Sequence, residues 1–201
     1  MRKVWEAWDC LQADLIDARV NISRELLDLE NSLTGELVRR LRDVISDYAP
    51  YFVDRESPER ETMKEGGGRP PTYDIAFVLR ENERLKWPIE AKVLERDSLA
   101  SMNDYLGNLS EDFLNCRYAP HSAEGAMIGY LLDGDPEAIF VIIENALSCD
   151  LTAHSAFSAR NHKCSAHNRS HERCQALKSP AEFRCHHLIL QVAGSMTGSR
   201  N

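Results

Sequence analysis

Two short stretches of the sequence decide the fold, Tyr73–Leu79 (YDIAFVL) and Trp87–Leu94 (WPIEAKVL). The first is a compact run rich in apolar, β-branched and aromatic residues, which is typical of a buried strand. The second alternates, so that Glu90 and Lys92 project to one face and their apolar neighbours to the other. The intervening Arg80–Lys86 (RENERLK) is polar and suits a turn. Together they predict an antiparallel hairpin.

Helical and strand-like segments surround this hairpin. Residues 4–48 are predicted to be helical, because apolar side chains between positions 26 and 45 recur at three- and four-residue steps. Residues 54–72 lack periodicity, are charged and then rich in Gly and Pro, and are predicted to form a mobile loop. Further along we expect a helix within 99–117, a strand at 126–132, a helix at 136–147 and a strand at 187–192, with little periodicity in 150–183.

This order of elements predicts the α/β class, with a mixed central sheet flanked by helices. At 201 residues we expect a single domain over 1–201. No window approaches eighteen apolar residues, and the N-terminus lacks the apolar region of a signal peptide. We therefore expect a cytoplasmic protein with no membrane association. The six cysteines are scattered without a CxxC pair and are expected to be reduced thiols.

The net charge of -8 is unfavourable for binding nucleic acid, but charge is unevenly distributed. Residues 159–187 contain six basic side chains against two acidic ones, and five of the seven histidines. A local basic surface can attract phosphates although the whole molecule is acidic. The acidity fits a subunit that gains nucleic-acid affinity from a protein partner or from another copy of itself.

The chemistry-bearing pattern is Glu90-Ala91-Lys92, since Lys92 is the one lysine with an acidic residue two positions earlier. Asp74 begins the preceding strand, and a hairpin can bring its carboxylate beside Glu90. Ionic side chains on apolar strands are costly unless they are paired or bind a cation. Two carboxylates and a lysine suit Mg²⁺ or Mn²⁺, which prefer oxygen ligands and activate water. The simpler alternative is a Glu–Lys ion pair on an exposed strand.

The order of helix-Glu, strand-Asp and strand Glu-x-Lys resembles the PD-(D/E)XK superfamily of restriction-like nucleases. The matching residues are Thr72-Tyr73-Asp74 followed by Pro88-Ile89-Glu90-Ala91-Lys92, within a resemblance that covers about residues 26–94. The proline that usually precedes the aspartate is not adjacent, although Pro70 and Pro71 are near. Residues 99–147 are also similar to the segment that follows the motif in small defence-associated members.

The resemblance implies a restriction-endonuclease-like fold and Mg²⁺-dependent hydrolysis of phosphodiesters, in DNA rather than RNA, with a role in bacterial defence. Asp74 and Glu90 would hold the metal, the carbonyl of Ala91 would be a further ligand, and Lys92 would serve the attacking water. The resemblance also implies a carboxylate from the first helix. Glu30 lies beside the apolar stripe and is the first choice, before Glu36 and Glu25.

The His/Cys-rich stretch permits three interpretations. Zinc ligands often come in pairs separated by two to four intervening residues. The candidates are Cys164, His167, Cys174, Cys185, His186 and His187, with Cys164–His167 as one close pair and His171–Cys174 as another. The cysteines are otherwise packing residues of a polar loop. In a nuclease, Arg169, His171 and Arg173 would contact phosphates, as would Arg69 beside the glycines at 66–68.

Two other functions remain open. The chain is alternatively a non-catalytic interaction subunit that keeps a nuclease-like fold. It is alternatively a zinc-stabilised nucleic-acid-binding module built on residues 162–187.

Overall fold

A computed structural model of the protein describes residues 1–17, 26–62, 69–95 and 98–192. The elements are α1 (Arg2–Ile16), α2 (Leu26–Val44), β1 (Tyr51–Pro58), β2 (Thr72–Leu79), β3 (Lys86–Leu94), α3 (Leu99–Gly107), the π-helix η1 (Asn108–Leu114), β4 (Glu124–Leu131), α4 (Pro136–Leu147), β5 (Thr152–Ala153), the 3₁₀-helix η2 (Ser155–Phe157), β6 (His162–Asn168), α5 (Glu172–Ala176) and β7 (Glu182–Gln191). The seven strands form one mixed sheet in the order β1-β2-β3-β4-β7-β6-β5. The predicted α/β class is confirmed.

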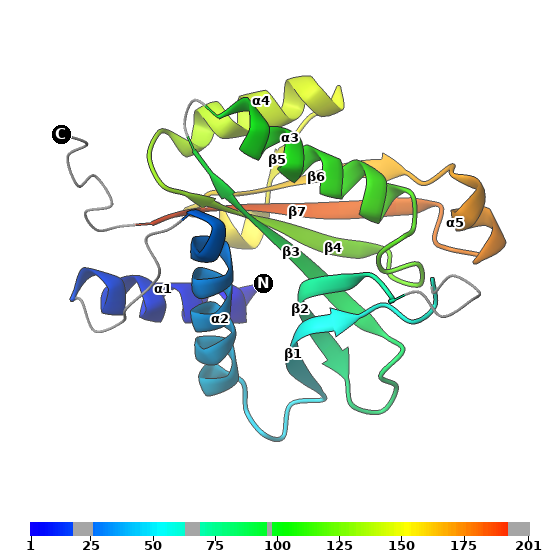
Figure 1. Cartoon of the computed structure of the whole chain (residues 1–201), viewed down its shortest axis with the longest axis horizontal. Coiled ribbons are helices and arrows are strands. Elements are labelled where there is room, and N and C mark those ends of the chain that lie inside the picture. The colour runs from blue at the N-terminus through cyan, green and yellow to red at the C-terminus, as the bar shows by residue number, and fades with distance from the viewer. Residues whose placement is uncertain (18–25, 63–68, 96–97, 193–201) are drawn as a thin grey trace.

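Helices cover both faces of this sheet (Figure 1). α1 and α2 lie on one face, where Trp8 and the leucine stripe of α2 pack against the sheet. α3, η1 and α4 lie on the other, around Tyr105, Phe113 and Phe140. Each fully buried large apolar side chain contributes about 1.5–3 kcal/mol, so these two layers hold the sheet rigidly. No helix in the described ranges is apolar over enough length to cross a membrane.

The predicted hairpin is confirmed as an antiparallel pairing of β2 with β3. This pairing runs from Val78↔Lys86 to Ile75↔Ile89. β3 then continues to Leu94 beside β4, to which it is parallel. The two hairpin strands therefore separate next to Asp74, and the edge of β3 beyond Ile89 is open to other groups.

Three strands differ from the expectation drawn from the sequence. β1 occupies part of the predicted loop 54–72, and β5 and β6 lie in the stretch of little periodicity. β1 is a polar edge strand whose extended shape is set by pairing with β2. β6 is rich in polar residues, yet it is paired on both sides, with β5 and with β7. Tertiary pairing overrides the weak local preference of these sequences.

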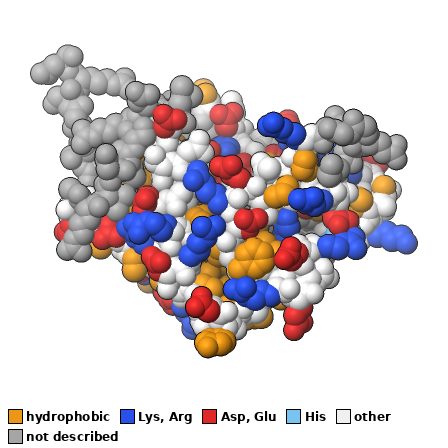
Figure 2. All heavy atoms as spheres, turned by 60° about the horizontal axis from the view of Figure 1, so that its bottom comes forward, with side chains coloured by type: hydrophobic (Ala, Val, Ile, Leu, Met, Phe, Trp, Pro, Cys, Tyr) orange, Lys and Arg blue, Asp and Glu red, His pale blue; other side chains and the backbone are white. Residues whose placement is uncertain are grey.

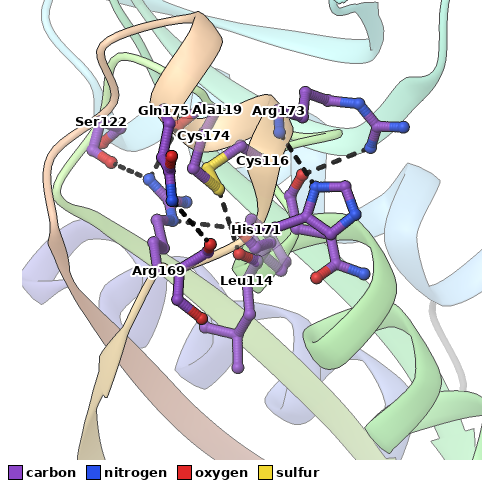
Figure 3. Close-up of a disulfide and its surroundings, with 12 residues drawn as sticks. Leu114, Cys116, Ala119, Ser122, Arg169, His171, Arg173, Cys174 and Gln175 are labelled. Carbon is purple, nitrogen blue, oxygen red and sulfur yellow. Dashed lines mark hydrogen bonds between the residues drawn. A yellow bond between two sulfur atoms is a disulfide. The ribbon is translucent and has the colours of Figure 1, made fainter.

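The expectation of six reduced thiols is wrong for one pair. Cys116 and Cys174 form a disulfide with a Cα–Cα distance of 5.3 Å. The two cysteines are 58 residues apart in the sequence. Their proximity arises because α5 folds back against the end of η1 (Figure 3), which no spacing rule could reveal. Among the described cysteines, Cys10, Cys149, Cys164 and Cys185 are free thiols.

Candidate active site

The open edge of β3 is capped by two carboxylates in place of a neighbouring strand. The backbone N–H of Ala91 donates to Asp74 Oδ2 at 2.8 Å. The backbone N–H of Val93 donates to Glu30 Oε2 at 3.3 Å. Alternate residues of a strand direct their N–H groups to the same edge, where each requires an acceptor. The separation of the hairpin strands thus fixes the positions of both carboxylates.

The ammonium group of Lys92 lies among the oxygens predicted to be metal ligands. Its Nζ is 2.8 Å from the carbonyl oxygen of Ala91 and 3.1 Å from Glu30 Oε1. It is 3.2 Å from Glu90 Oε1 and 3.9 Å from Asp74 Oδ2. The fold therefore brings Asp74, Glu90, Lys92, Glu30 and the Ala91 carbonyl to one point.

Glu30 is the helix glutamate that reaches this point. Glu36, one alternative, instead accepts hydrogen bonds from Arg39 and Arg40 on its own helix. Glu25, the other alternative, lies outside the described residues. The position of Glu30 in the first turns of α2, next to β3, agrees with the choice made from the sequence.

The electrostatics of the site favour additional positive charge. Burial, and then the negative charge of Asp74, raise the pKa of Glu90 to about 8. Burial also raises the pKa of Asp74, against the opposing effects of Lys92 and the Ala91 N–H. For Lys92, burial favours a lower pKa, but Glu90, Asp74 and Glu30 together raise it. Three carboxyl groups thus share one ammonium.

One oxygen of Glu90 is buried without a partner. Glu90 is 5% exposed, and within the described ranges its Oε2 has no hydrogen-bond donor. A buried oxygen in that state costs about 1–3 kcal/mol, and more when it is charged. A cation would satisfy it. The donor set of carboxylates and one carbonyl consists entirely of oxygen, which fits Mg²⁺ or Mn²⁺.

A second layer of polar side chains, which the sequence gave no reason to select, positions Glu90. Asn108 on η1 donates to Glu90 Oε1 at 3.3 Å and to Asp112 Oδ2 at 2.8 Å. Arg117 in turn donates to Asp112 Oδ1 at 2.5 Å. The π-helical geometry of η1 spaces these residues, and such short π-helical segments are frequent at functional sites.

Arg169, one of the residues predicted to contact phosphate, instead binds carbonyl groups inside the protein. Arg169 is 5% exposed, and its guanidinium donates to the carbonyls of Phe113, Ala119 and Ser122 (Figure 3). Burial lowers the pKa of Arg169 to about 10. Through these hydrogen bonds Arg169 links the end of β6 to the end of η1 and the segment after it. Little of its guanidinium is exposed to solvent, where it would have to contact a phosphate.

The other predicted phosphate contacts have mixed surroundings. His171 accepts a hydrogen bond from the Arg173 N–H and caps α5, while Arg173 donates to the Asn115 carbonyl (Figure 3). Arg69 is exposed, beside residues that lie outside the described ranges. On the face shown in Figure 2, basic and acidic side chains are interspersed. That face, as far as it is described, presents no extended basic track.

The predicted zinc ligands are divided between separate locations. Cys174 is in the disulfide, and Cys185 packs in the core on the α3 and α4 face. His187 is fully buried, between Tyr105 Oη at 2.9 Å and Ser165 Oγ at 2.8 Å, and His167 also contacts Ser165. Both ring nitrogens of His187 are thus hydrogen-bonded without a metal.

A different set, His162, Cys164 and His186, does converge. In the described part of the chain it is the one group of three His, Cys, Asp or Glu side chains whose ligand atoms all lie within 4.8 Å of one another. The carboxylates around Lys92 are spread more widely about the ammonium. Burial lowers the pKa of His162 to about 3 and that of His186 to about 4. Cys164 and His186 were among the ligands predicted from the sequence, but His162 was not, because a single residue separates it from Cys164.

Comparison of the chain with protein-family models, with curated proteins and with solved structures finds no match in any of the three.

Proposed function

We propose that the chain is a metal-dependent phosphodiesterase with a restriction-endonuclease-like core, which hydrolyses DNA. The observation that carries this proposal is the gathering of four oxygens around the Lys92 ammonium where β2 and β3 separate. The unpartnered Oε2 of Glu90 supports it, because a bound cation would give that oxygen a partner. A short resemblance to PD-(D/E)XK nucleases adds the expected reaction.

Asp74, Glu90, Glu30 and the Ala91 carbonyl are the groups that would hold Mg²⁺ or Mn²⁺. Such an ion, when bound, neutralises charge on a phosphate and makes a bound water more acidic. The Lys92 ammonium contacts the same oxygens, so ion and ammonium compete for them. Displaced toward the phosphate, Lys92 can orient the attacking water and stabilise negative charge that develops on the phosphoryl oxygens.

The remaining residues keep the carboxylates in place. The N–H groups of Ala91 and Val93 fix the carboxylates of Asp74 and Glu30, and Asn108 fixes that of Glu90. Because these supports are backbone groups of a strand or side chains of a packed helix, the three carboxylates are already in position before substrate binds.

The substrate is expected to reach this site with help from a partner. The chain has a net charge of -8, and Arg169 in its basic segment is committed to internal carbonyls. We therefore propose that a partner protein or a second copy supplies phosphate contacts, within a bacterial defence complex that recognises foreign DNA.

A second candidate is a non-catalytic subunit with the same fold. The Lys92 ammonium already pairs with three carboxylates, and such an ion cluster can simply stabilise a protein. In that case the surface would bind a partner and the cluster would bind no divalent ion.

Cleavage of supercoiled plasmid in Mn²⁺ tests the two candidates. We expect nicking by the wild-type chain and a loss of about 100-fold or more in Asp74→Asn, since an electrostatic group of the site is removed. Asp54→Asn on the neighbouring strand β1 is the matched control and should retain activity. Nicking by Asp74→Asn at the wild-type rate, with both variants folded by circular dichroism, would refute the nuclease assignment.

A further inference from the structure

We propose that His162, Cys164 and His186 form a zinc site with three protein ligands and an exchangeable fourth position. This site is separate from the carboxylates around Lys92 and does not depend on the proposed nuclease activity. All three side chains are buried, with exposed fractions of 1%, 8% and 4%. Their placement follows from the pairing of two strands.

The register of β6 and β7 brings the three side chains to one face of the sheet. Cys164 lies directly opposite His186 in this antiparallel pair. His162 is two residues before Cys164, so its side chain projects to the same face and reaches His186 diagonally. Strand pairing thus joins ligands 22 and 24 residues apart in the sequence.

Two of the three ligand separations are close to those of a zinc tetrahedron, and the three ligand atoms all lie within 4.8 Å of one another. With Zn–N of about 2.0–2.1 Å and Zn–S of about 2.3 Å, tetrahedral ligands lie about 3.3 Å apart for two nitrogens and about 3.6 Å for nitrogen and sulfur. His162 Nε2 is 3.0 Å from His186 Nδ1, and Cys164 Sγ is 3.3 Å from the same nitrogen. Each separation needs to open by only about 0.3 Å to admit the ion.

The donor chemistry selects zinc over the hard cations. A thiolate and two imidazoles suit Zn²⁺, whereas Mg²⁺ and Mn²⁺ prefer oxygen. The Oε2 of Glu124 lies 3.7 Å from His186 Nε2. A carboxylate there favours a proton on Nε2 and leaves Nδ1 free to bind the metal, as in the carboxylate–histidine–zinc arrangement.

One of the three ligands, His186, lines a cavity of about 760 Å³, through which a fourth ligand can reach the ion. His186, Glu124, His154, Phe157 and Trp87 are among its lining residues. The His154 ring stacks on that of His162, but its Nδ1 accepts a hydrogen bond from the Ala156 N–H at 3.2 Å. This fixes the His154 proton on Nε2, so His154 is no ligand in this conformation. An open fourth position is characteristic of zinc sites that bind water or substrate.

Metal binding would change the surroundings of a tryptophan. Without metal, a hydrogen-bond chain runs from the Trp5 indole to His162 Nδ1 at 3.5 Å and from His162 Nε2 to His186 Nδ1. Zinc on Nε2 requires the proton on Nδ1, which removes the long Trp5 contact. Tryptophan fluorescence is therefore a reporter of the site.

Metal content of the full chain provides the first test. After expression with zinc and dialysis, we expect about one zinc per wild-type chain and loss of most of it in Cys164→Ser. Cys185→Ser is the matched control, because Cys185 is a buried thiol on the paired strand with its side chain in the opposite core. Absence of zinc from the wild type, or equal zinc in Cys164→Ser, would overturn the proposal.

Cobalt binding gives a second test, which begins with the wild-type protein and so does not depend on whether a cluster variant folds. Wild-type protein titrated with Co²⁺ should develop thiolate-to-metal charge-transfer absorption and a change in tryptophan fluorescence, and a wild type without that absorption would contradict thiolate ligation. Asp74→Asn should bind Co²⁺ with the same absorption, so a nuclease-negative, cobalt-positive result separates this proposal from the proposed function. Loss of the cobalt absorption in folded Asp74→Asn would contradict the independence of the two sites.

Discussion

The carboxylate site around Lys92 and the His162–Cys164–His186 cluster solve the same problem in opposite ways. Both collect polar side chains on a largely apolar sheet. The first holds three carboxyl groups together with a charged ammonium, whereas the second holds uncharged imidazoles and a thiol that burial keeps neutral. The comparison teaches that a cluster built on charge needs a cation to remain intact, while a neutral one tolerates its absence.

The largest expected effect comes from removing the Lys92 ammonium from the first cluster. Lys92→Met leaves three carboxyl groups facing one another and should lower the free energy of unfolding by about 3–5 kcal/mol. Mn²⁺ should restore much of that loss, because the variant has no ammonium to compete with the ion for the oxygens. Thermal unfolding with and without Mn²⁺ measures both effects.

Lys163→Met is the control for this variant. Lys163 pairs with the largely exposed Glu137, and such a pair contributes about 0–1 kcal/mol. If Lys92→Met were no less stable than Lys163→Met, or gained nothing from Mn²⁺, the four oxygens would not constitute a cation site.

The second cluster should respond to acid. The pKa values of His162 and His186 are lowered by burial to about 3 and about 4 in the folded protein, against 6.5 when unfolded. The unfolded chain therefore binds more protons between these values, and stability falls as pH drops from about 6.5 toward 4. Each such histidine contributes a slope of about 1.4 kcal/mol per pH unit. Urea unfolding of the metal-free protein, measured at several pH values across this range, should show a weaker dependence of stability on pH in His162→Gln than in the wild type. An equal dependence would contradict buried neutral histidines.

The first cluster should show a pH dependence in its metal affinity, at higher pH than the second cluster shows one in stability. Glu90, with a pKa of about 8, is largely protonated below that pH and must lose its proton to bind an ion. Affinity for Mn²⁺ should therefore rise about tenfold per pH unit up to about pH 8. Calorimetric titration in buffers of different ionisation enthalpy should detect the released proton. Constant affinity between pH 6 and 8 would show that Glu90 is not a ligand.

The smallest effect concerns the support of Glu90. Asn108→Ala removes one hydrogen bond to Glu90 and one to Asp112, and should cost about 1 kcal/mol of stability. It should reduce nicking several-fold while leaving the zinc content of the second cluster unchanged. Nicking and zinc content should be measured in parallel on this variant. If both declined together, the two sites would not be independent.

The parts of the fold that the sequence predicted are those with strong local periodicity. The β2–β3 hairpin and the leucine stripe of α2 follow from patterns within a few turns or strand residues. β1 and β6 lack such patterns, since polar residues of these strands are satisfied by partners far along the chain. The disulfide between Cys116 and Cys174 depends on how α5 meets η1, which is a tertiary event.

The two sites also differ in how far local sequence patterns could predict them. Glu90, Lys92 and Asp74 lie on one hairpin, so their meeting could be predicted from strand geometry. Asn108 joins them only through the π-helical turn of η1. His162 reaches His186, 24 residues away in the sequence, only through the register of β6 with β7, which no local spacing reveals.

The most direct test of the central claim is anomalous X-ray diffraction from crystals of the protein soaked in Mn²⁺. We predict a manganese ion bound by Asp74, Glu90, Glu30 and the Ala91 carbonyl, with the Lys92 ammonium moved away from those oxygens. An ammonium still in contact with all four, and no anomalous signal beside them at saturating Mn²⁺, would contradict the account.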